Sequence, residues 1–195
     1  MVLMPNMTKD EARKHTIFEE EFYPLSNALF NFAYHLTLSE ADADDLVQEA
    51  YFKAFRFIDS YEVGTNPKAW LFKILKNAFI NKYRKETRQP NKVNIDDINS
   101  RQDDENSPYS TYTDLRTEMF DKMMGDEVTI AIDSLQVDAR TVILLSDIEG
   151  FTYEEISKIV NIPIGTVRSR LFRARNTLKK RLMEYASSLG YEDKR

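Results

Sequence analysis

A run of positive charge along one helical face is the pattern in this chain that is best suited to binding chemistry. Between Gly165 and Arg181 there are seven basic residues and no acidic ones. A solvated helix face normally mixes both signs of charge, so charge of a single sign predicts a polyanionic partner. At helical spacing this face carries Arg168, Ser169, Phe172, Arg173 and Asn176. The simpler alternative is an ordinary helix with a basic face.

The elements around this face predict a helix-turn-helix. Thr152 and Glu155 have the spacing of a capping box, which starts a short helix, and Asn161-Ile162-Pro163 interrupts that helix. A second helix opens at Gly165. Its apolar residues recur every three or four positions and therefore share one buried seam: Val167, Leu171, Ala174, Leu178 and Leu182.

A second candidate for nucleic-acid chemistry is a helix predicted over residues 67–88, because Pro67 suits the first helical position. Its predicted core side has Trp70, Leu71, Ile74, Leu75 and Ala78. Another face has Lys73, Lys76, Asn77, Ile80 and Arg84, with Tyr83 near its edge and Tyr61 in the preceding loop. Cations interleaved with aromatic residues fit single-stranded nucleic acid, whose phosphates and unstacked bases they bind. The alternative is a common Lys-rich amphipathic helix.

A third candidate is a partner surface on the helix predicted over residues 39–58. Its acidic first turn, with Asp42, Asp44 and Asp45, is explained by the helix dipole. Gln48 and Glu49 beside an exposed Phe52 have no such explanation and indicate protein binding. The expected buried stripe of this helix is Leu46, Val47, Ala50, Ala54, Phe57 and Ile58.

The whole chain is predicted to be all-α, with two small helical domains at residues 10–90 and 126–185. Further helices are expected from Thr8 to Phe22, over 25–36, from Val128, and over 140–147, with a break at Pro24. Residues 91–125 lack helical periodicity, which predicts an acidic flexible linker.

The charge is distributed unevenly along the chain. Net charge is −7 over residues 1–66, +7 over 67–92, −8 over 93–134 and +3 over 135–195. The overall charge of −5 therefore hides two basic patches.

Composition excludes several classes of site. The chain has no cysteine, so disulfides, iron–sulfur clusters and thiol nucleophiles are ruled out. His15 and His35 stand twenty residues apart and are expected to be structural or on the surface. We expect no catalytic residues, no metal and no cofactor. The sequence contains neither a long apolar run nor a signal peptide, which predicts a cytoplasmic protein without membrane insertion.

Two segments together resemble the extracytoplasmic function (ECF) group of bacterial RNA polymerase sigma factors, in the sigma-70 family. They are ADADDLVQEAYFKAFRFIDSYEVGTNPKAWLFKILKNAFINKYRK and LSDIEGFTYEEISKIVNIPIGTVRSRLFRARNTLKKRL, and the resemblance covers about residues 16–90 and 128–183. It implies a sigma-2 domain that docks on core polymerase and melts the −10 element. It also implies a sigma-4 domain that reads the −35 element.

The resemblance also implies a role for individual residues. Docking on the β′ clamp helices falls to Asp45, Gln48, Glu49 and Phe52, and the β flap is a further polymerase contact. Binding of the −10 element falls to Tyr61, Gly64, Thr65, Asn66, Lys73, Lys76, Asn77 and Arg84. Binding of the −35 element falls to Thr166, Arg168, Ser169, Arg170, Phe172 and Arg173. Arg170 lies off the centre of the outward face, which suits a phosphate contact better than a base contact.

The segment YEVGTNPKAWLFKILKNAFINKYRK is most similar to the branch that responds to thiol-oxidative stress under zinc-binding anti-sigma factors. In that case the redox sensor lies in the partner, because this chain has no cysteine. The main alternative function is a stand-alone helix-turn-helix transcriptional regulator, which would have no use for the Gln48–Phe52 surface. An enzyme is a more distant alternative, since no histidine base or glycine-rich loop accompanies the paired carboxylates.

Overall fold

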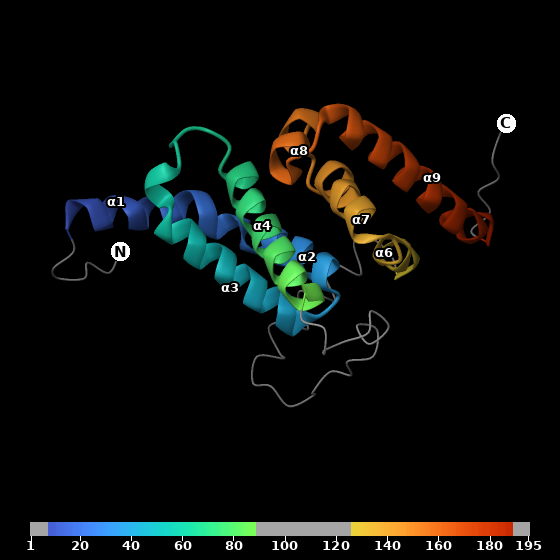
Figure 1. Ribbon diagram of the computed structural model, residues 1–195, viewed down its shortest axis with the longest axis horizontal. Coiled ribbons are helices and arrows are strands. Elements are labelled where there is room, and N and C mark those ends of the chain that lie inside the picture. Colours follow the sequence, from blue (N-terminus) through green and yellow to red (C-terminus); the bar gives the residue numbers. More distant parts are fainter. Residues whose placement is uncertain (1–7, 89–125, 189–195) are drawn as a thin grey trace.

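The structure, a computed structural model, describes residues 8–88 and 126–188. Every regular element in these two ranges is helical, which confirms the all-α prediction. The predicted acidic linker, residues 91–125, lies outside the described residues. Figure 1 shows the helices in two groups. We call residues 8–88 the first lobe and residues 126–188 the second lobe.

The first lobe is built from four α-helices joined by short irregular turns. The α-helices are α1 (Lys9–Ile17), α2 (Ser26–Thr37), α3 (Glu40–Arg56) and α4 (Pro67–Arg88). Between α1 and α2 the chain forms a π-helical turn, η1 (Phe18–Phe22), and a 3₁₀ turn, η2 (Tyr23–Leu25). Pro24 lies in that 3₁₀ turn, so the predicted break occurs there. A second 3₁₀ turn, η3 (Ile58–Ser60), follows α3.

Side-chain caps explain where three of the first-lobe helices, α1, α3 and α4, begin. Thr8 and Glu11 form the predicted capping box, with the Glu11 amide donating to Thr8 Oγ1 over 3.2 Å. Ser39 Oγ accepts the Asp42 amide and starts α3. Asn66 Oδ1 accepts the Ala69 amide over 2.9 Å, just before Pro67 opens α4.

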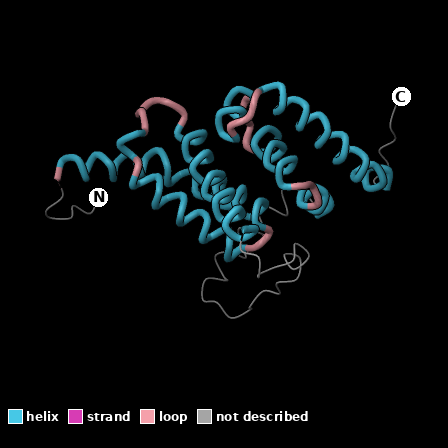
Figure 2. Tube along the Cα trace, in the orientation of Figure 1, coloured by secondary structure: helices cyan, strands magenta, loops and turns pink. Residues whose placement is uncertain are grey.

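The second lobe contains α6 (Asp126–Asp133), α7 (Val137–Ile143), α8 (Tyr153–Val160) and α9 (Ile164–Ser188). α7 begins three residues earlier than predicted, and its continuation is a π-helical turn, η5 (Leu144–Ile148). The predicted capping box of Thr152 and Glu155 is present at the start of α8. Figure 2 shows the short loops that join these helices.

Burial confirms the first part of the predicted seam of α9, since Val167, Leu171 and Ala174 are buried. Leu178 and Leu182, further along the helix, are half-buried. In the first lobe the buried face of α3 includes Leu46, Ala50, Ala54 and, just beyond the helix, Ile58, as expected. Phe57 was placed in the same stripe, and that prediction is wrong because its ring is largely exposed. α3 ends at Arg56, and the chain leaves helical geometry at Phe57, so the ring no longer follows the helical face.

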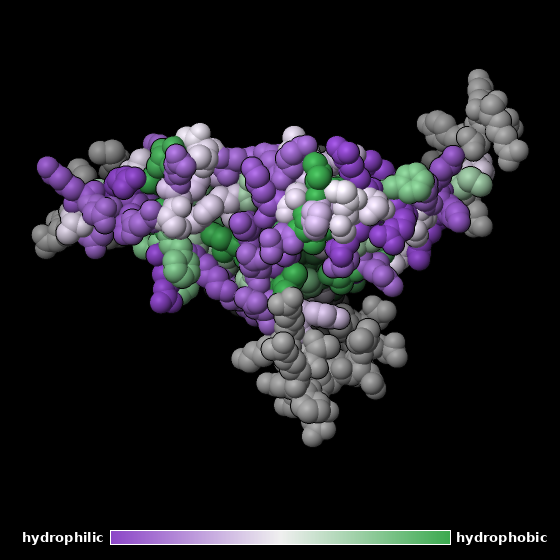
Figure 3. Space-filling model, turned by 45° about the horizontal axis from the view of Figure 1, so that its top comes forward, coloured by the Kyte–Doolittle hydropathy of each residue, from purple (hydrophilic) through white to green (hydrophobic). Residues whose placement is uncertain are grey.

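The two lobes pack against each other in one continuous hydrophobic core. α4 of the first lobe contacts α8 of the second, and α2 contacts α7. In Figure 1, α9 extends away from this junction, as does α1 on the opposite side. The surface in Figure 3 is mainly hydrophilic, with hydrophobic side chains in separate places.

Candidate nucleic-acid and polymerase interfaces

The turn between α8 and α9 has the geometry that a helix-turn-helix requires. Asn161 ends α8 in a left-handed conformation with φ of 55°, a conformation that asparagine adopts more readily than most residues. Ser157 Oγ donates to the Ile162 carbonyl over 2.6 Å, and the Thr166 amide donates to the Pro163 carbonyl over 2.8 Å. These bonds fix the angle at which α9 leaves the turn.

Most of the predicted −35 residues lie on an open face of α9. Arg168, Ser169 and Arg173 are exposed, and the Phe172 ring is 68% exposed. Thr166 is half-buried at the start of the helix. Because Val167, Leu171 and Ala174 are buried behind them, these side chains project away from the lobe. The arrangement can place cations and an aromatic ring into a groove of duplex DNA.

Two arginines of α9 are bound within the second lobe. Arg170 forms an ion pair with Asp138 at 2.9 Å, which agrees with the sequence expectation that Arg170 lies off the centre of the outward face. Arg175 donates twice to the Asp147 carboxylate, over 3.0 and 2.6 Å, and also reaches Tyr153 Oη and Ser146 Oγ. Arg175 therefore joins α9 to η5 and to the first residue of α8.

Electrostatics support the pairing of Arg175 with Asp147. Partial burial by itself would raise the pKa of the Asp147 carboxyl, but hydrogen bonds from Arg175 and Ser146 bring that pKa below its ordinary value. The hydrogen bond to Asp147 likewise raises the pKa of Arg175. No local pattern in the sequence indicates this pair, because its members are 28 residues apart.

A cavity of about 510 Å³ lies beside α9, next to the loop between α6 and α7. Its lining includes Arg170, Arg173 and Arg181 together with Asp138. Three guanidinium groups and one carboxylate give the cavity a positive balance. Arg181 was not among the predicted binding residues, although it belongs to the same charge run.

The loop between η3 and α4 is anchored by Tyr61. Only 5% of Tyr61 is exposed, and its ring packs edge-on against Phe22 and at a tilt against Trp70. Its hydroxyl donates to the Glu21 carboxylate. Burial raises the pKa of that hydroxyl to about 12, and Glu21 acts in the same direction. In this conformation the Tyr61 ring is covered, so it holds the loop and leaves no face open to a base.

The rest of that loop is exposed. Gly64 adopts a φ of 87°, a region that suits glycine, and Thr65 Oγ1 donates to the Glu62 carbonyl over 2.6 Å. Asn66 uses its oxygen to cap α4, while its Nδ2 donates to Glu155 Oε1 of the second lobe over 2.7 Å.

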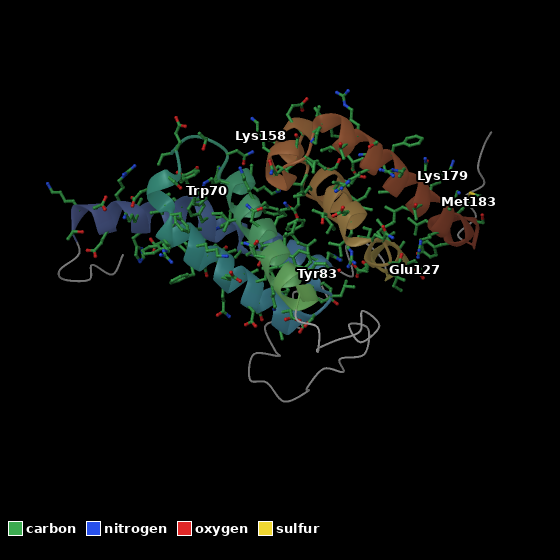
Figure 4. All side chains as sticks on the ribbon, viewed as in Figure 1. Trp70, Tyr83, Glu127, Lys158, Lys179 and Met183 are labelled. Carbon is green, nitrogen blue, oxygen red and sulfur yellow. The ribbon has the colours of Figure 1, made fainter. Side chains whose placement is uncertain are left out.

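The predicted basic face of α4 is divided between solvent and the lobe junction. Lys73 and Asn77 are exposed. Lys76 is only 8% exposed, because its Nζ donates to the Val160 carbonyl at the end of α8 over 3.1 Å. Arg84 belongs to α4, but its side chain lies outside the described part of the structure. Figure 4 places Trp70 and Tyr83 toward opposite ends of α4 and Lys158 on the neighbouring α8.

The predicted docking surface on α3 is fully accessible. Asp45, Gln48 and Glu49 are exposed, and so is 68% of Phe52. Glu49 also pairs with Lys53 at 2.5 Å. Phe55, one helical turn further on, is also exposed and was not singled out from the sequence. Aromatic residues are enriched at protein-binding surfaces, so the exposed pair of Phe52 and Phe55 supports the predicted docking role.

The described residues show no arrangement for metal or membrane chemistry. No group of three or more His, Cys, Asp and Glu side chains within residues 8–88 and 126–188 is placed to hold a metal ion. The buried His35 has its Nδ1 2.6 Å from Asp133 Oδ1, as a structural histidine would. None of the described helices has the length and hydropathy of a membrane span.

Comparison with known proteins agrees with this arrangement. Residues 24–89 match Sigma-70 region 2, and residues 126–178 match Sigma-70, region 4. The ECF RNA polymerase sigma-E factor of Escherichia coli (strain K12) is 33% identical over 141 residues, which are 72% of this chain and 74% of that protein. The ECF RNA polymerase sigma factor SigE of Mycolicibacterium smegmatis is 32% identical over 162 residues, which are 83% of this chain but only 60% of that longer protein.

Solved structures have the same architecture. The sigma factor RpoE from Bartonella quintana, determined in complex with the anti-sigma factor NepR, is 34% identical with a TM-score of 0.65. The match covers 85% of this chain and 96% of that one. CnrH, determined with the cytosolic domain of CnrY, is 21% identical with a TM-score of 0.59 over 89% and 94% of the two chains, and shows the fold alone. The chain belongs to the ECF RNA polymerase sigma factors.

Proposed function

We propose that this sigma factor divides promoter recognition between its two lobes, which correspond to domains at residues 10–90 and 126–185. The second lobe reads the −35 element through α9, and the first lobe docks on core polymerase and binds the opened −10 strand. The observation that carries the proposal is the pairing of an exposed aromatic surface on α3 with a one-signed basic face on α9. A stand-alone regulator is not favoured, because Sigma-70 region 2 matches residues 24–89.

The −35 contacts are assigned to Thr166, Arg168, Ser169, Phe172 and Arg173. Arginine can bind a guanine edge through two hydrogen bonds, and each such pair contributes about 1–3 kcal/mol of discrimination. Because Asp138 pairs with Arg170, we assign Arg170 to a backbone phosphate at the edge of the groove. Phosphate contacts of this kind set position and do not depend on sequence.

The −10 contacts are assigned to Gly64, Thr65, Asn66, Lys73, Lys76 and Asn77, together with Arg84. Tyr61 acts by holding the loop, and it reaches a base only if its ring leaves the Phe22 and Trp70 packing. Capturing an unstacked base and neutralising phosphates supply the free energy for strand opening. The protein contributes no catalytic step of its own, and the polymerase performs RNA synthesis.

Docking on the β′ clamp helices is assigned to Asp45, Gln48, Glu49 and Phe52, with a second contact between the second lobe and the β flap. We further infer an anti-sigma partner, because the similar RpoE was solved with one. Zinc binding by that partner and control of thiol-oxidative stress genes rest on the resemblance of the α4 segment. The protein would act in the cytoplasm, where RNA polymerase is found.

In vitro transcription with core RNA polymerase and a promoter library tests the proposal. We expect promoter-specific initiation only when the protein is added. Sequence-specific DNA binding without core, accompanied by no initiation, would support the regulator instead. A zinc-binding partner is tested by co-purification followed by metal analysis of the complex.

A further inference from the structure

The hydroxyl of Tyr61 is bound to a carboxylate from a distant part of the first lobe. It donates to Glu21, which lies 40 residues earlier, in the π-helical turn η1. Glu21 is half-buried, whereas its neighbours Glu19 and Glu20 are exposed. None of the proposed contacts with DNA or polymerase involves Glu21, although its hydrogen bond joins η1 to the loop assigned to the −10 element.

The aromatic ring of Tyr61 is held from the same turn. Phe22, the residue after Glu21, packs edge-on against it with the ring centroids 5.1 Å apart, and Trp70 of α4 lies 5.2 Å away. Phe22 and Trp70 stack on each other at 5.3 Å, so the three rings form one cluster. Two adjacent residues of η1 therefore hold Tyr61, one by its ring and the other by its hydroxyl.

The π-helical geometry of η1 explains how two adjacent residues reach one side chain. The Tyr23 amide donates to the Phe18 carbonyl, which is the hydrogen bond of a π-helical turn. Such a turn contains more residues than a turn of α-helix, so neighbouring side chains point in more similar directions. Glu21 and Phe22 are therefore both directed toward the loop. Single π-helical turns of this kind are frequent at functional sites.

The Tyr61 hydroxyl also connects Glu21 to the part of the loop that meets DNA in our proposal. The Thr65 hydroxyl interacts with it and partly opposes the rise in the pKa of Tyr61 that burial and Glu21 cause. Thr65 donates in addition to the Glu62 carbonyl over 2.6 Å, and Asn66 caps α4 at the end of the loop. The loop is therefore fixed at both ends, with exposed residues between them.

We propose that Glu21 is a positioning residue for recognition of the −10 element, and that it acts through the Tyr61 hydroxyl. A loop that is already ordered loses less conformational entropy when it binds a base, so it binds the base more tightly. The hydrogen bond to the carboxylate is charge-assisted and is therefore stronger than a bond between neutral groups. Glu21 itself touches no DNA. This inference rests on the proposed −10 function of the first lobe.

Glu21→Met is the first test variant, because it keeps the length of the side chain and removes the acceptor. Holoenzyme is assembled from core RNA polymerase and the full-length protein. It is titrated with a fluorescent single-stranded oligonucleotide that carries the −10 sequence of a promoter used by wild type, and with a scrambled oligonucleotide. We expect the ratio of the two affinities to fall about fivefold, since one charge-assisted hydrogen bond at a partly exposed site is lost. Binding of a −35 duplex should not change.

Glu21→Gln is the conservative variant, because its amide oxygen still accepts a hydrogen bond but carries no charge. It should recover part of the affinity ratio that Glu21→Met loses. In a Tyr61→Phe background, which lacks the donor, neither substitution at Glu21 should lower the ratio further. A role of Glu21 that does not pass through Tyr61 would make the losses additive, and additive losses would overturn the inference.

Glu20→Met is the matched control, because Glu20 is exposed beside Glu21 and the substitution changes charge and shape in the same way. It should change the affinity ratio less than about twofold, as expected for an exposed charge that is screened by salt. Equal losses in Glu20→Met and Glu21→Met would overturn the inference.

Trp70 reports on the aromatic cluster without DNA, because it is the only tryptophan in the chain. Its ring contacts Tyr61 and Phe22, so loosening of the cluster should make it more accessible. Acrylamide should quench the fluorescence of free Glu21→Met more strongly than that of wild type or Glu20→Met, while the circular dichroism spectrum stays helical. Equal quenching in all three proteins would overturn the inference.

The inference and the proposed function fail in different ways. If wild type initiates transcription and prefers the −10 oligonucleotide, but Glu21→Met behaves like Glu20→Met, the positioning role fails and the proposed function stands. If wild type initiates from no promoter of the library, the proposed function fails and the inference fails with it.

Discussion

Replacing Phe52 with alanine should weaken docking on core RNA polymerase without changing the stability of the fold. The Phe52 ring is 68% exposed, whereas Leu46 on the same helix is buried. A phenylalanine side chain that is taken from water into an interface removes roughly 150–250 Å² of surface. With 68% of it still available, about 140 Å² could be buried on docking, which corresponds to about 3.5 kcal/mol at about 25 cal/mol per Å². Interfaces seldom recover the full value, so we expect a loss of about 2 kcal/mol, or roughly 30-fold in core affinity.

Core affinity is measured by titrating labelled protein with core RNA polymerase. The free energy of unfolding of Phe52→Ala should stay within about 0.5 kcal/mol of wild type, since an exposed ring contributes little to folding. Leu46→Ala is the contrast, and it should destabilise the fold by about 2–5 kcal/mol. If Phe52→Ala binds core polymerase as tightly as wild type, the docking surface is not where we assign it. If Phe52→Ala is destabilised as much as Leu46→Ala, the Phe52 ring is packed against the fold in the unbound protein and is not exposed.

Three further predictions concern the DNA surfaces and the second lobe. Asn77→Ala should impair initiation through the −10 element while leaving −35 binding intact, as measured by transcription and duplex binding in parallel; equal loss of both would contradict the assignment. Arg168→Ala should reduce discrimination within the −35 element by about 1–3 kcal/mol, and a uniform, salt-dependent weakening across sequences would mean phosphate contact instead. Asp147→Asn should cost at most about 1 kcal/mol, because the pair with Arg175 is more than one third exposed. The folded pKa of Asp147 lies below its unfolded value, so its contribution is present above the unfolded pKa and is lost as the pH falls through the folded pKa. Wild type should therefore lose its advantage over Asp147→Asn in denaturant unfolding as the pH falls below about 4, and a constant difference down to pH 2 would refute the pairing.

Features that depend on neighbours in the sequence were predicted well. The capping boxes at Thr8 and Thr152 involve residues three positions apart, and both are present. Pro67 begins α4 as expected, and the apolar seam of α9 is buried from Val167 to Ala174. A local rule fixes each of these features, because caps and helical periodicity act within one or two turns.

Features that depend on tertiary contact were harder to predict. Tyr61 was predicted among the −10 contacts, and the sequence did not indicate that η1 and α4 bring Phe22 and Trp70 around its ring. Lys76 was expected on an open basic face, but the end of α8, 84 residues away in sequence, supplies its acceptor. Helical periodicity in the sequence cannot indicate a contact between residues that are so far apart along the chain. The ion pair between Lys68 and Glu149, at 2.8 Å, was not predicted for the same reason.

The same contrast applies to the candidate sites. The exposure of the α3 surface and of the outer face of α9 could be predicted, because no other described element covers the residues there. The exposure of the residues that we assign to the −10 element could be predicted only in part, since Asn66 and Lys76 contact the second lobe. Helical spacing therefore identifies correctly which residues share the basic face of α4. It does not predict that the second lobe covers part of that face.

Strand opening on a promoter tests the central claim most directly. Permanganate modifies unpaired thymines, so its reactivity on a duplex promoter reports melting at each position. With core RNA polymerase and this protein together, we predict reactive thymines confined to the −10 region and the start site, and none with either component alone. Promoter binding with no reactive thymines would contradict the account, because it would show a protein that binds duplex DNA and does not open it.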